Sequence, residues 1–286
     1  AMMADDKLRG ELLELGIDKR INDAQLSNAR TLFARAIETP GGLKIQTIHS
    51  FCAGVLRRFP LEAKVSPQFR EMEDRMAEML RSDVVDAMVL GEHAHVVHAL
   101  LAHFTGDDLA KFTAEIAGKR DAFTAPVTNE QIKALLGLEP DAQREDALRM
   151  AFEGDEAAIV DEIKEAFRGQ SATYKKLAEQ LSALDLENPT WAGLDTLFGH
   201  FLYAGTCNSK SVNFPPSNHT KAVEAMAPIA DTVHEWMDRV AAAKAHLWSI
   251  DAFERTRALY DFAEVFVPAY EARKLATGAL DFDDLI

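Results

Sequence analysis

Apolar side chains recur every third or fourth residue along most of this chain, and that spacing predicts amphipathic α-helices. Two helices are expected at residues 3–15 and 24–37, before a Pro-Gly-Gly turn, and a third at residues 48–59. Ten further segments have the same spacing: 73–90, 92–104, 107–118, 128–137, 141–153, 155–168, 171–184, 190–204, 219–247 and 250–276. The chain is therefore expected to be mainly α.

The last two of these segments are long, and their apolar positions, among them Val233, Trp236, Met237 and Val240, predict antiparallel helices joined near Ser249. Such a pair would form the spine of a helical domain. Just before it, residues 206–220 read TCNSKSVNFPPSNHT, in which two prolines and clustered Asn and Ser predict an exposed, mobile loop. Strand signals are few: residues 43–46, LKIQ, form the one convincing β-run, and residues 67–69 are expected to be extended.

Charge is unevenly distributed along the chain. The sequence holds 31 Lys and Arg against 46 Asp and Glu, a formal net charge of −15. Its surface as a whole should therefore repel nucleic acid and anionic membranes. Residues 1–70 hold 11 basic and 8 acidic side chains, whereas residues 71–286 hold 20 and 38. Any contact with phosphate must be local, and the first 70 residues have the more suitable balance.

Cysteine content and hydropathy indicate the compartment. Cys52 and Cys207 are too few for a disulfide framework or a Cys-rich zinc site, and nothing resembles a cleaved signal peptide. We therefore expect a cytoplasmic protein. No apolar run approaches the roughly 18 residues that cross a membrane, so no membrane partner is expected.

The stretch most typical of a functional site is TIHSFC, which follows the LKIQ run and opens a helix. Amides at a helix start lack intrahelical acceptors, so the hydroxyls of Thr47 and Ser50 can cap the helix or share those donors with a phosphate. From the residues alone, both interpretations remain open. Cys52 follows His49 by three positions, as a nucleophile and its base could. Its place on the apolar stripe favours a buried structural cysteine instead.

A histidine cluster allows a second kind of site. Four histidines fall within GEHAHVVHALLAHF, which invites a metal hypothesis: His93, His95, His98 and His103. The run lacks the H-E-x-x-H order that places two ligands and a base on one helix face. Solvated or packed histidines are the simpler interpretation.

The C-terminal LDFDDLI brings three carboxylates together, from Asp281, Asp283 and Asp284. Clustered carboxylates can hold Mg²⁺, although aspartates also gather at helix N-termini for electrostatic reasons. Elsewhere the sequence has no G-x-x-x-x-G-K-[ST] loop and no hydrophobic strand that ends in Asp-Glu. The chain is therefore not expected to cradle a nucleoside triphosphate by itself in the P-loop manner.

Two separated stretches resemble one protein family. LKIQTIHSFCAGVLRRFPLEAKVSPQF resembles the segment that follows motif Ia in UvrD-like superfamily 1 DNA helicases, and RKLATGALDFDDLI resembles the stretch just upstream of their Walker B strand. The wording of RTLFARAIETPGGLKIQTIHSFC is similar to the AddA-type helicase–nuclease subunits of bacterial double-strand-break repair. The likeness covers the first 70 and the last 15 residues.

This resemblance implies a domain organisation. Residues 1–70 would form part of a RecA-like motor domain with very few strands, residues 71–277 a large helical 1B-like arm, and residues 278–286 the return into the motor. The Walker A and Walker B elements are missing, so we expect an inactive internal fragment of an ATP-dependent DNA helicase and exonuclease. It would be either a piece of a longer protein or a truncated reading frame. ATP and Mg²⁺ would belong to the parent protein, with no cofactor or metal in this chain.

The resemblance also implies site residues and partners. The family's Thr-x-His-Ser element falls on Thr47, His49 and Ser50, which implies contact with single-stranded DNA. Duplex DNA is a candidate partner of the arm, and an AddB-type subunit is the expected protein partner. LDFDDLI would pack inside the motor domain without supplying the Mg²⁺ ligands, so no catalytic residue is expected.

Two rival hypotheses remain open. The acidic balance of residues 71–286 would also suit a stand-alone helical protein-interaction module that binds no DNA. A metalloenzyme built on the histidines between residues 93 and 103 is the third hypothesis.

Overall fold

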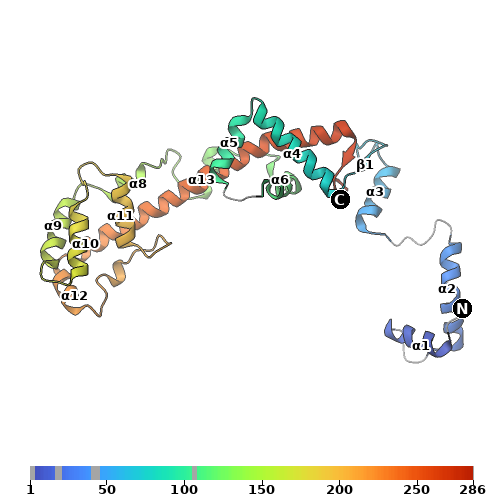
Figure 1. The fold of residues 1–286 in the computed structure, drawn as a ribbon, viewed down its shortest axis with the longest axis horizontal. Coiled ribbons are helices and arrows are strands. Elements are labelled where there is room, and N and C mark those ends of the chain that lie inside the picture. Colours follow the sequence, from blue (N-terminus) through green and yellow to red (C-terminus); the bar gives the residue numbers. More distant parts are fainter. Residues whose placement is uncertain (1–3, 17–20, 40–45, 105–107, 286) are drawn as a thin grey trace. The chain divides into compact units, whose positions relative to one another are not determined.

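A computed structural model describes residues 4–16, 21–39, 46–104 and 108–285 (Figure 1). The chain divides into two compact units, one of Ala1–Asp74 with Leu275–Ile286 and the other of Arg75–Lys274. In the described residues α-helices dominate and the two strands are short, so the predicted mainly α fold is confirmed. Within the same residues no single helix is long and apolar enough to cross a membrane, and one helix pair, bent by 109°, reaches that length and composition only when joined.

Within its described residues, the first unit has three α-helices, two strands and a 3-10 helix. Their bounds are α1 (Asp5–Glu14), α2 (Asp23–Glu38), α3 (Ile48–Arg58), β1 (Arg70–Glu71), β2 (Ala279–Leu280) and η4 (Phe282–Asp284). Helices α1 and α2 share a small apolar cluster of Leu12, Ile21 and Leu26. Asn22 and Gln25 form a capping box at the start of α2, which satisfies two backbone amides there.

The strands of this unit are not the ones that the sequence predicts. β1 pairs with β2 in parallel, with Arg70 opposite Ala279 and Glu71 opposite Leu280. Two-residue strands are too short to show an alternating pattern, so periodicity could not reveal them. In the predicted strand 43–46, residues 43–45 lie outside the described residues and Gln46 is not in a strand. The expected extended segment 67–69 instead begins as a turn, in which the Phe69 amide donates to the Ser66 carbonyl over 3.0 Å.

In the described residues of the second unit, the named elements are all helices, and one isolated antiparallel bridge pairs Leu202 with Ser209. The bounds of these helices are α4 (Asp74–Leu90), α5 (Ala94–His103), α6 (Leu109–Gly118), η1 (Arg120–Phe123), α7 (Asn129–Leu135), α8 (Asp146–Ala151), α9 (Glu156–Phe167), α10 (Ala172–Ser182), α11 (Trp191–Phe201), η2 (Ser211–Asn213), α12 (Thr220–Met226), η3 (Ala227–Ile229) and α13 (Ala230–Thr277). Helices α8 to α12 surround the N-terminal half of α13, and α4 to α6 lie along its C-terminal half (Figure 1).

Helix α13 corrects one prediction from the sequence. The two antiparallel helices expected on either side of Ser249 are a single helix of 48 residues. Serine costs only a few tenths of a kcal/mol in a helix interior, and neither Gly nor Pro occurs between Ala230 and Val267. The break comes earlier, because Pro228 lies in η3 between α12 and α13.

The largest core of this unit lies around the N-terminal half of α13. Trp236 is fully buried, its ring contacts Phe201 edge to face with centroids 5.0 Å apart, and its Nε1 donates to the Ala151 carbonyl over 3.0 Å. That hydrogen bond satisfies the indole inside an apolar environment. The sequence-predicted core positions Val233, Trp236, Met237 and Val240 all belong to this cluster.

The segment between α11 and α12 is only partly the exposed loop that its composition predicts. Val212 is 99% exposed, but Ser211 and Pro215 are buried. Ser211 donates to Asp238 Oδ1 over 2.8 Å, and His234 Nε2 lies 2.7 Å from the Phe214 carbonyl. Both partners are on α13, so the segment is fixed by contacts that are remote in sequence and invisible to local composition.

A buried carboxylate joins α9 to α13. The Glu156 side chain is 1% exposed and accepts from the amides of Glu153 and Gly154, over 2.8 and 2.9 Å, and from Arg239 Nη2 over 2.9 Å. Arg239 also pairs with Glu153 and Asp155. Its hydrogen bond is the main cause that lowers the pKa of Asp155. Arg239 therefore compensates several carboxylates at once.

We predict that Arg239→Ala lowers the free energy of unfolding by roughly 3 kcal/mol, because it leaves a buried carboxylate without its cation. Urea unfolding followed by circular dichroism measures the change. Arg168→Ala is the matched control, since Arg168 pairs with Glu165 on an exposed helix face and should cost less than about 0.5 kcal/mol. Equal losses in the two variants would contradict the role given to Arg239.

Candidate nucleic-acid interface

Thr47 begins α3 and caps it. Its backbone is extended and its Oγ1 accepts from the Ser50 amide over 3.3 Å, while the two hydroxyl oxygens lie 3.1 Å apart. The amides of Ile48 and His49, in the same first turn, have no acceptor among the residues that the structure describes. Capping and anion binding are thus compatible here, because the cap engages one amide and leaves two.

The structure divides the predicted Thr-x-His-Ser element into two parts. Thr47 and Ser50 are exposed, whereas His49 is half-buried. The His49 ring lies edge-on to Phe282 with centroids 4.9 Å apart and an interplanar angle of 66°. A ring contact of this kind fixes the imidazole on the unit itself, whereas the two hydroxyl side chains are exposed.

A small core beside α3 brings together the two sequence stretches that resemble the helicase family. Ala53 of α3 is buried against Phe69 and Leu285, with Cys52, Leu56, Val65 and Leu280 packed around them. Residues that are more than 200 positions apart in the chain thus meet in one cluster. Cys52 takes part in this core, as its place on the apolar stripe predicts.

The C-terminal aspartates serve as caps. Asp281 and Asp284 form a capping box in which the Asp281 amide donates to Asp284 Oδ2 over 2.9 Å and the Asp284 amide donates to Asp281 Oδ1 over 3.1 Å. Asp281 is buried. This geometry supports the capping interpretation of LDFDDLI rather than a magnesium site.

The histidine cluster was the other candidate for a metal site. His95 Nδ1 lies 3.2 Å from the Glu92 carbonyl, and His93 precedes the first residue of α5. Across the part of the chain that the structure describes, no three His, Cys, Asp or Glu side chains are placed to hold a metal ion.

The arginines at the end of α3 differ in their availability. Arg57 pairs with Glu71 over 2.8 Å and lies over the Phe69 ring, 5.1 Å from its centroid. Arg58 is exposed, and no ion pair within the described ranges involves it. Both follow the Thr47 cap by almost the full length of the helix, about 15 Å. Lys44, the third basic candidate, lies outside the described residues.

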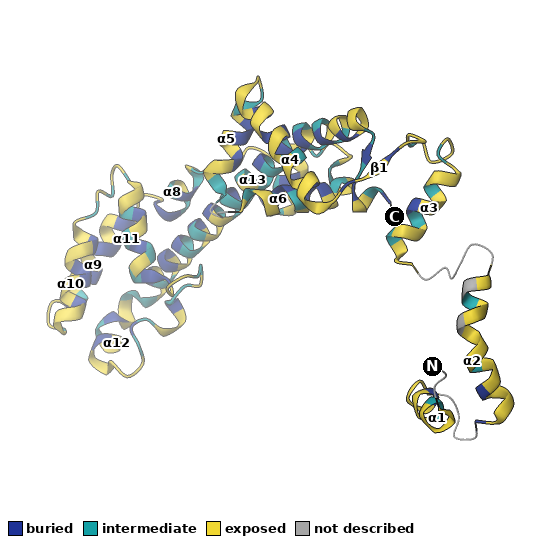
Figure 2. Ribbon diagram, turned by 45° about the vertical axis from the view of Figure 1, so that its right-hand side comes forward, coloured by how far each residue is buried: buried dark blue, intermediate teal, exposed yellow. Residues whose placement is uncertain are grey.

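The outer face of α3 is apolar, which the sequence analysis missed. Ile48, Phe51, Val55 and Phe59 are each at least 40% exposed, and Figure 2 colours most of α3 as exposed. The apolar spacing of residues 48–59 had instead predicted one stripe of Phe51, Cys52, Val55, Leu56 and Phe59. The inward face holds Cys52, Ala53 and Leu56. The sequence signal for this second apolar face is the two adjacent apolar pairs at 51–52 and 55–56. Neighbouring residues on a helix point about 100° apart, so one member of each pair must lie outside a single narrow stripe.

Comparisons with known proteins agree with the likeness in these stretches. A family model described as the UvrD/REP helicase N-terminal domain matches residues 16–286. Proteins named as the A-type subunits of ATP-dependent helicase/nucleases are also similar. The one from Enterococcus faecalis is 31% identical over 101 residues, which is 34% of this chain and 8% of the relative. Those from Listeria monocytogenes serotype 4a and Geobacillus kaustophilus are each 30% identical over 112 residues, 37% of this chain and 8% of the relative.

The aligned part of this chain thus spans only about a twelfth of the length of these curated relatives. No solved structure matches the chain.

The cap geometry gives a direct test. Thr47→Ala should destabilise the first turn of α3 by about 1 kcal/mol, because the Ser50 amide loses its acceptor. Hydrogen exchange at that amide, measured by NMR, should become roughly fivefold faster, in line with that free energy. Thr47→Ser keeps a hydroxyl and should keep most of the protection. An unchanged exchange rate in the alanine variant would show that Thr47 does not cap α3 in solution.

Proposed function

Because the chain belongs to the UvrD/REP helicase N-terminal domain family, we propose that it is a DNA-contacting piece of an ATP-dependent helicase and nuclease subunit of double-strand-break repair. The observation that carries the proposal is the start of α3. There, two exposed hydroxyls 3.1 Å apart lie beside first-turn amides without acceptors in the described residues, in the unit that contains the positively balanced residues 1–70. This is the chemistry of a phosphate contact.

The contact would act on the DNA backbone. Phosphate oxygens accept hydrogen bonds from the Thr47 and Ser50 hydroxyls and from the first-turn amides, and the partial positive charge of the helix start adds attraction. None of these donors contacts a base, so the contact is independent of DNA sequence, as a translocating motor requires. His49 takes the role of a positioning residue, since its packing on Phe282 holds the start of α3 against the return segment.

The two units would have different roles in the parent protein. We assign the first unit to part of a motor domain and the second to a helical arm, which could meet duplex DNA or an AddB-type subunit. ATP and Mg²⁺ would bind to other parts of the parent protein. The outer face of α3 fits this assignment, because a row of exposed apolar side chains suits burial against the rest of such a domain.

An acidic interaction module is the second candidate function. Residues 75–274 hold 20 basic and 32 acidic side chains, a net charge of −12. That charge opposes contact with duplex DNA over most of the surface. The module hypothesis and the helicase fragment differ in one measurable property, the binding of single-stranded DNA by the first unit.

Binding of a labelled single-stranded oligonucleotide, followed by fluorescence anisotropy at low salt, tests the proposal. We expect weak, salt-sensitive binding that falls roughly tenfold in Thr47→Ala/Ser50→Ala, since a hydroxyl hydrogen bond to a charged phosphate is lost. Ser27→Ala/Thr31→Ala is the matched control, because it removes the same two hydroxyl types from exposed positions on α2.

Equal affinities of the two double variants would refute the contact at α3. Absence of binding at every salt concentration would favour the acidic module. DNA-stimulated ATP hydrolysis by the purified chain would contradict its assignment as a fragment without a nucleotide-hydrolysing site.

A further inference from the structure

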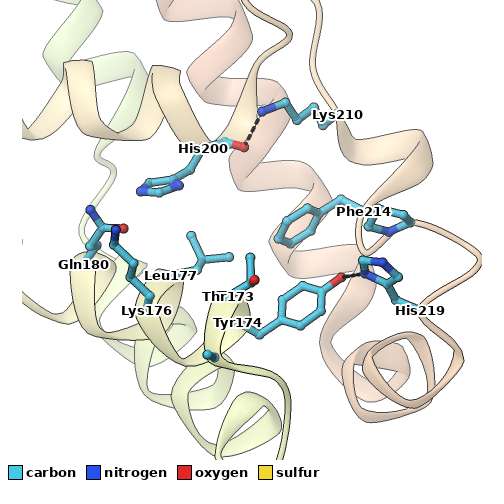
Figure 3. A pocket seen from close by; sticks show the side chains of 11 residues that line it. Thr173, Tyr174, Lys176, Leu177, Gln180, His200, Lys210, Phe214 and His219 are labelled. Atoms are coloured by element: carbon cyan, nitrogen blue, oxygen red, sulfur yellow. Dashed lines mark hydrogen bonds between the residues drawn. The ribbon is translucent and has the colours of Figure 1, made fainter.

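The second unit has a hollow of about 690 Å³ between α10, α11 and the segment that follows α11. Lys176, Gln180 and His200 face one another on one side of it, and Tyr174, Phe214 and His219 lie on the other (Figure 3). Among the described residues, no carboxylate lines the hollow, although residues 75–274 carry 32 acidic side chains. Its size falls within the range of roughly 300–1,000 Å³ that small-molecule sites occupy.

The lining of the hollow contains two lysines and, among the described residues, no carboxylate. His200 is partly buried, and its pKa is lowered mainly by burial and further by the charges of Lys210 and Lys176. The imidazole is therefore neutral at pH 7 and can donate or accept a hydrogen bond. Two cations that act on one ring, with no carboxylate in the described lining, form an uncompensated charge to which an anion would be attracted.

Lys210 is held in place by the end of α11. Its Nζ donates to the carbonyls of His200 and Gly199 over 3.0 and 3.3 Å, which are acceptors that a helix C-terminus leaves unpaired. Burial lowers the pKa of Lys210, so a nearby anion would favour its charged form. The side chain thus has a structural role at the end of α11 and adds positive charge to the lining of the hollow.

The aromatic side of the hollow is rigid. The Tyr174 hydroxyl lies 2.7 Å from His219 Nδ1, and the two rings are perpendicular with an interplanar angle of 87°. Burial raises the pKa of Tyr174, so the hydroxyl keeps its proton and can donate it to Nδ1. Phe214 is half-buried and packs against the main core of the unit. A planar group could lie against this fixed wall without first ordering it.

We propose that this hollow is a nucleotide site, with the phosphate at Lys176, Gln180 and His200 and the base against the Tyr174–Phe214–His219 wall. The site is separate from the proposed DNA contact at α3, and its described lining contains no P-loop. A phosphate next to a planar base is found both in a free nucleotide and at the end of a DNA strand. The experiment below distinguishes the two sources.

Lys175 supplies a matched control on the same helix. It is exposed like Lys176 but lines a different hollow, with Lys164, Arg168 and Glu179. Calorimetric titration of the full chain with thymidine 5′-monophosphate should show binding that Lys176→Ala weakens about tenfold, as expected when a hydrogen bond to a charged group is lost. Lys175→Ala should change the affinity less than twofold. Phe214→Leu should weaken the nucleotide but not inorganic phosphate, because it removes only the ring.

The other outcomes are equally informative. Equal losses in Lys175→Ala and Lys176→Ala would mean diffuse attraction and overturn the proposal, as would equal affinity for inorganic phosphate and the nucleotide. Absence of binding by the nucleotide and by a short oligothymidylate would overturn it too. Binding of the oligothymidylate alone, lost in Lys176→Ala, would support the site and identify a strand as its source. The loss of nucleotide binding in Lys176→Ala and the loss of single-stranded DNA binding in Thr47→Ala/Ser50→Ala are separate measurements on separate variants, so this proposal and the α3 contact can fail independently.

Discussion

The second unit depends on the continuity of α13. A helix of 48 residues extends about 70 Å, and none of the shorter helices described beside it has enough apolar surface to fold alone. Its N-terminal half is surrounded by α8 to α12 and its C-terminal half by α4 to α6. Arg239 shows how the polar surface of α13 is also used, since one guanidinium compensates carboxylates on and before α9. The hollow lined by Lys176 and His200 follows from this arrangement, because α11 packs against α13 through Phe201 and Trp236 and α10 packs beside α11.

In the first unit, the proposed DNA contact and the packing involve different side chains of one short element. Thr47 and Ser50 face solvent at the start of α3, while His49 and Cys52 hold that start against the return segment. The resemblance treats the Thr-x-His-Ser element as a single contact. In the structure the hydroxyls of Thr47 and Ser50 are exposed, whereas the His49 ring packs on Phe282. This packing holds the start of α3 in position although its hydroxyls face solvent.

Helical periodicity was sufficient to predict most elements, because long amphipathic segments such as α4, α9 and α10 bury one face. It failed where the deciding contacts are remote. The expected helix junction at Ser249 was inferred from local sequence alone, whereas α13 continues through that residue. Ser211 is buried because it is hydrogen-bonded to Asp238, 27 residues later. The strands β1 and β2 have two residues each, and they form only by pairing with each other, although more than 200 residues separate them in the chain. The α3 donors could be proposed from the sequence, but the contact of His49 with Phe282 could not.

The parallel pairing of β1 with β2 has a consequence for the order of folding. Residues 72–278 form the connection between the two strands, and closing a flexible loop of that length costs roughly 5 kcal/mol of entropy. The ladder includes the bonds from the Arg70 amide to Gly278 and from the Met72 amide to Leu280, of 2.9 and 2.8 Å, and each contributes about 1 kcal/mol net. So short a sheet cannot nucleate its own formation. We therefore expect the second unit to fold first. β1 and β2 then pair in a later step, once the chain between them is folded.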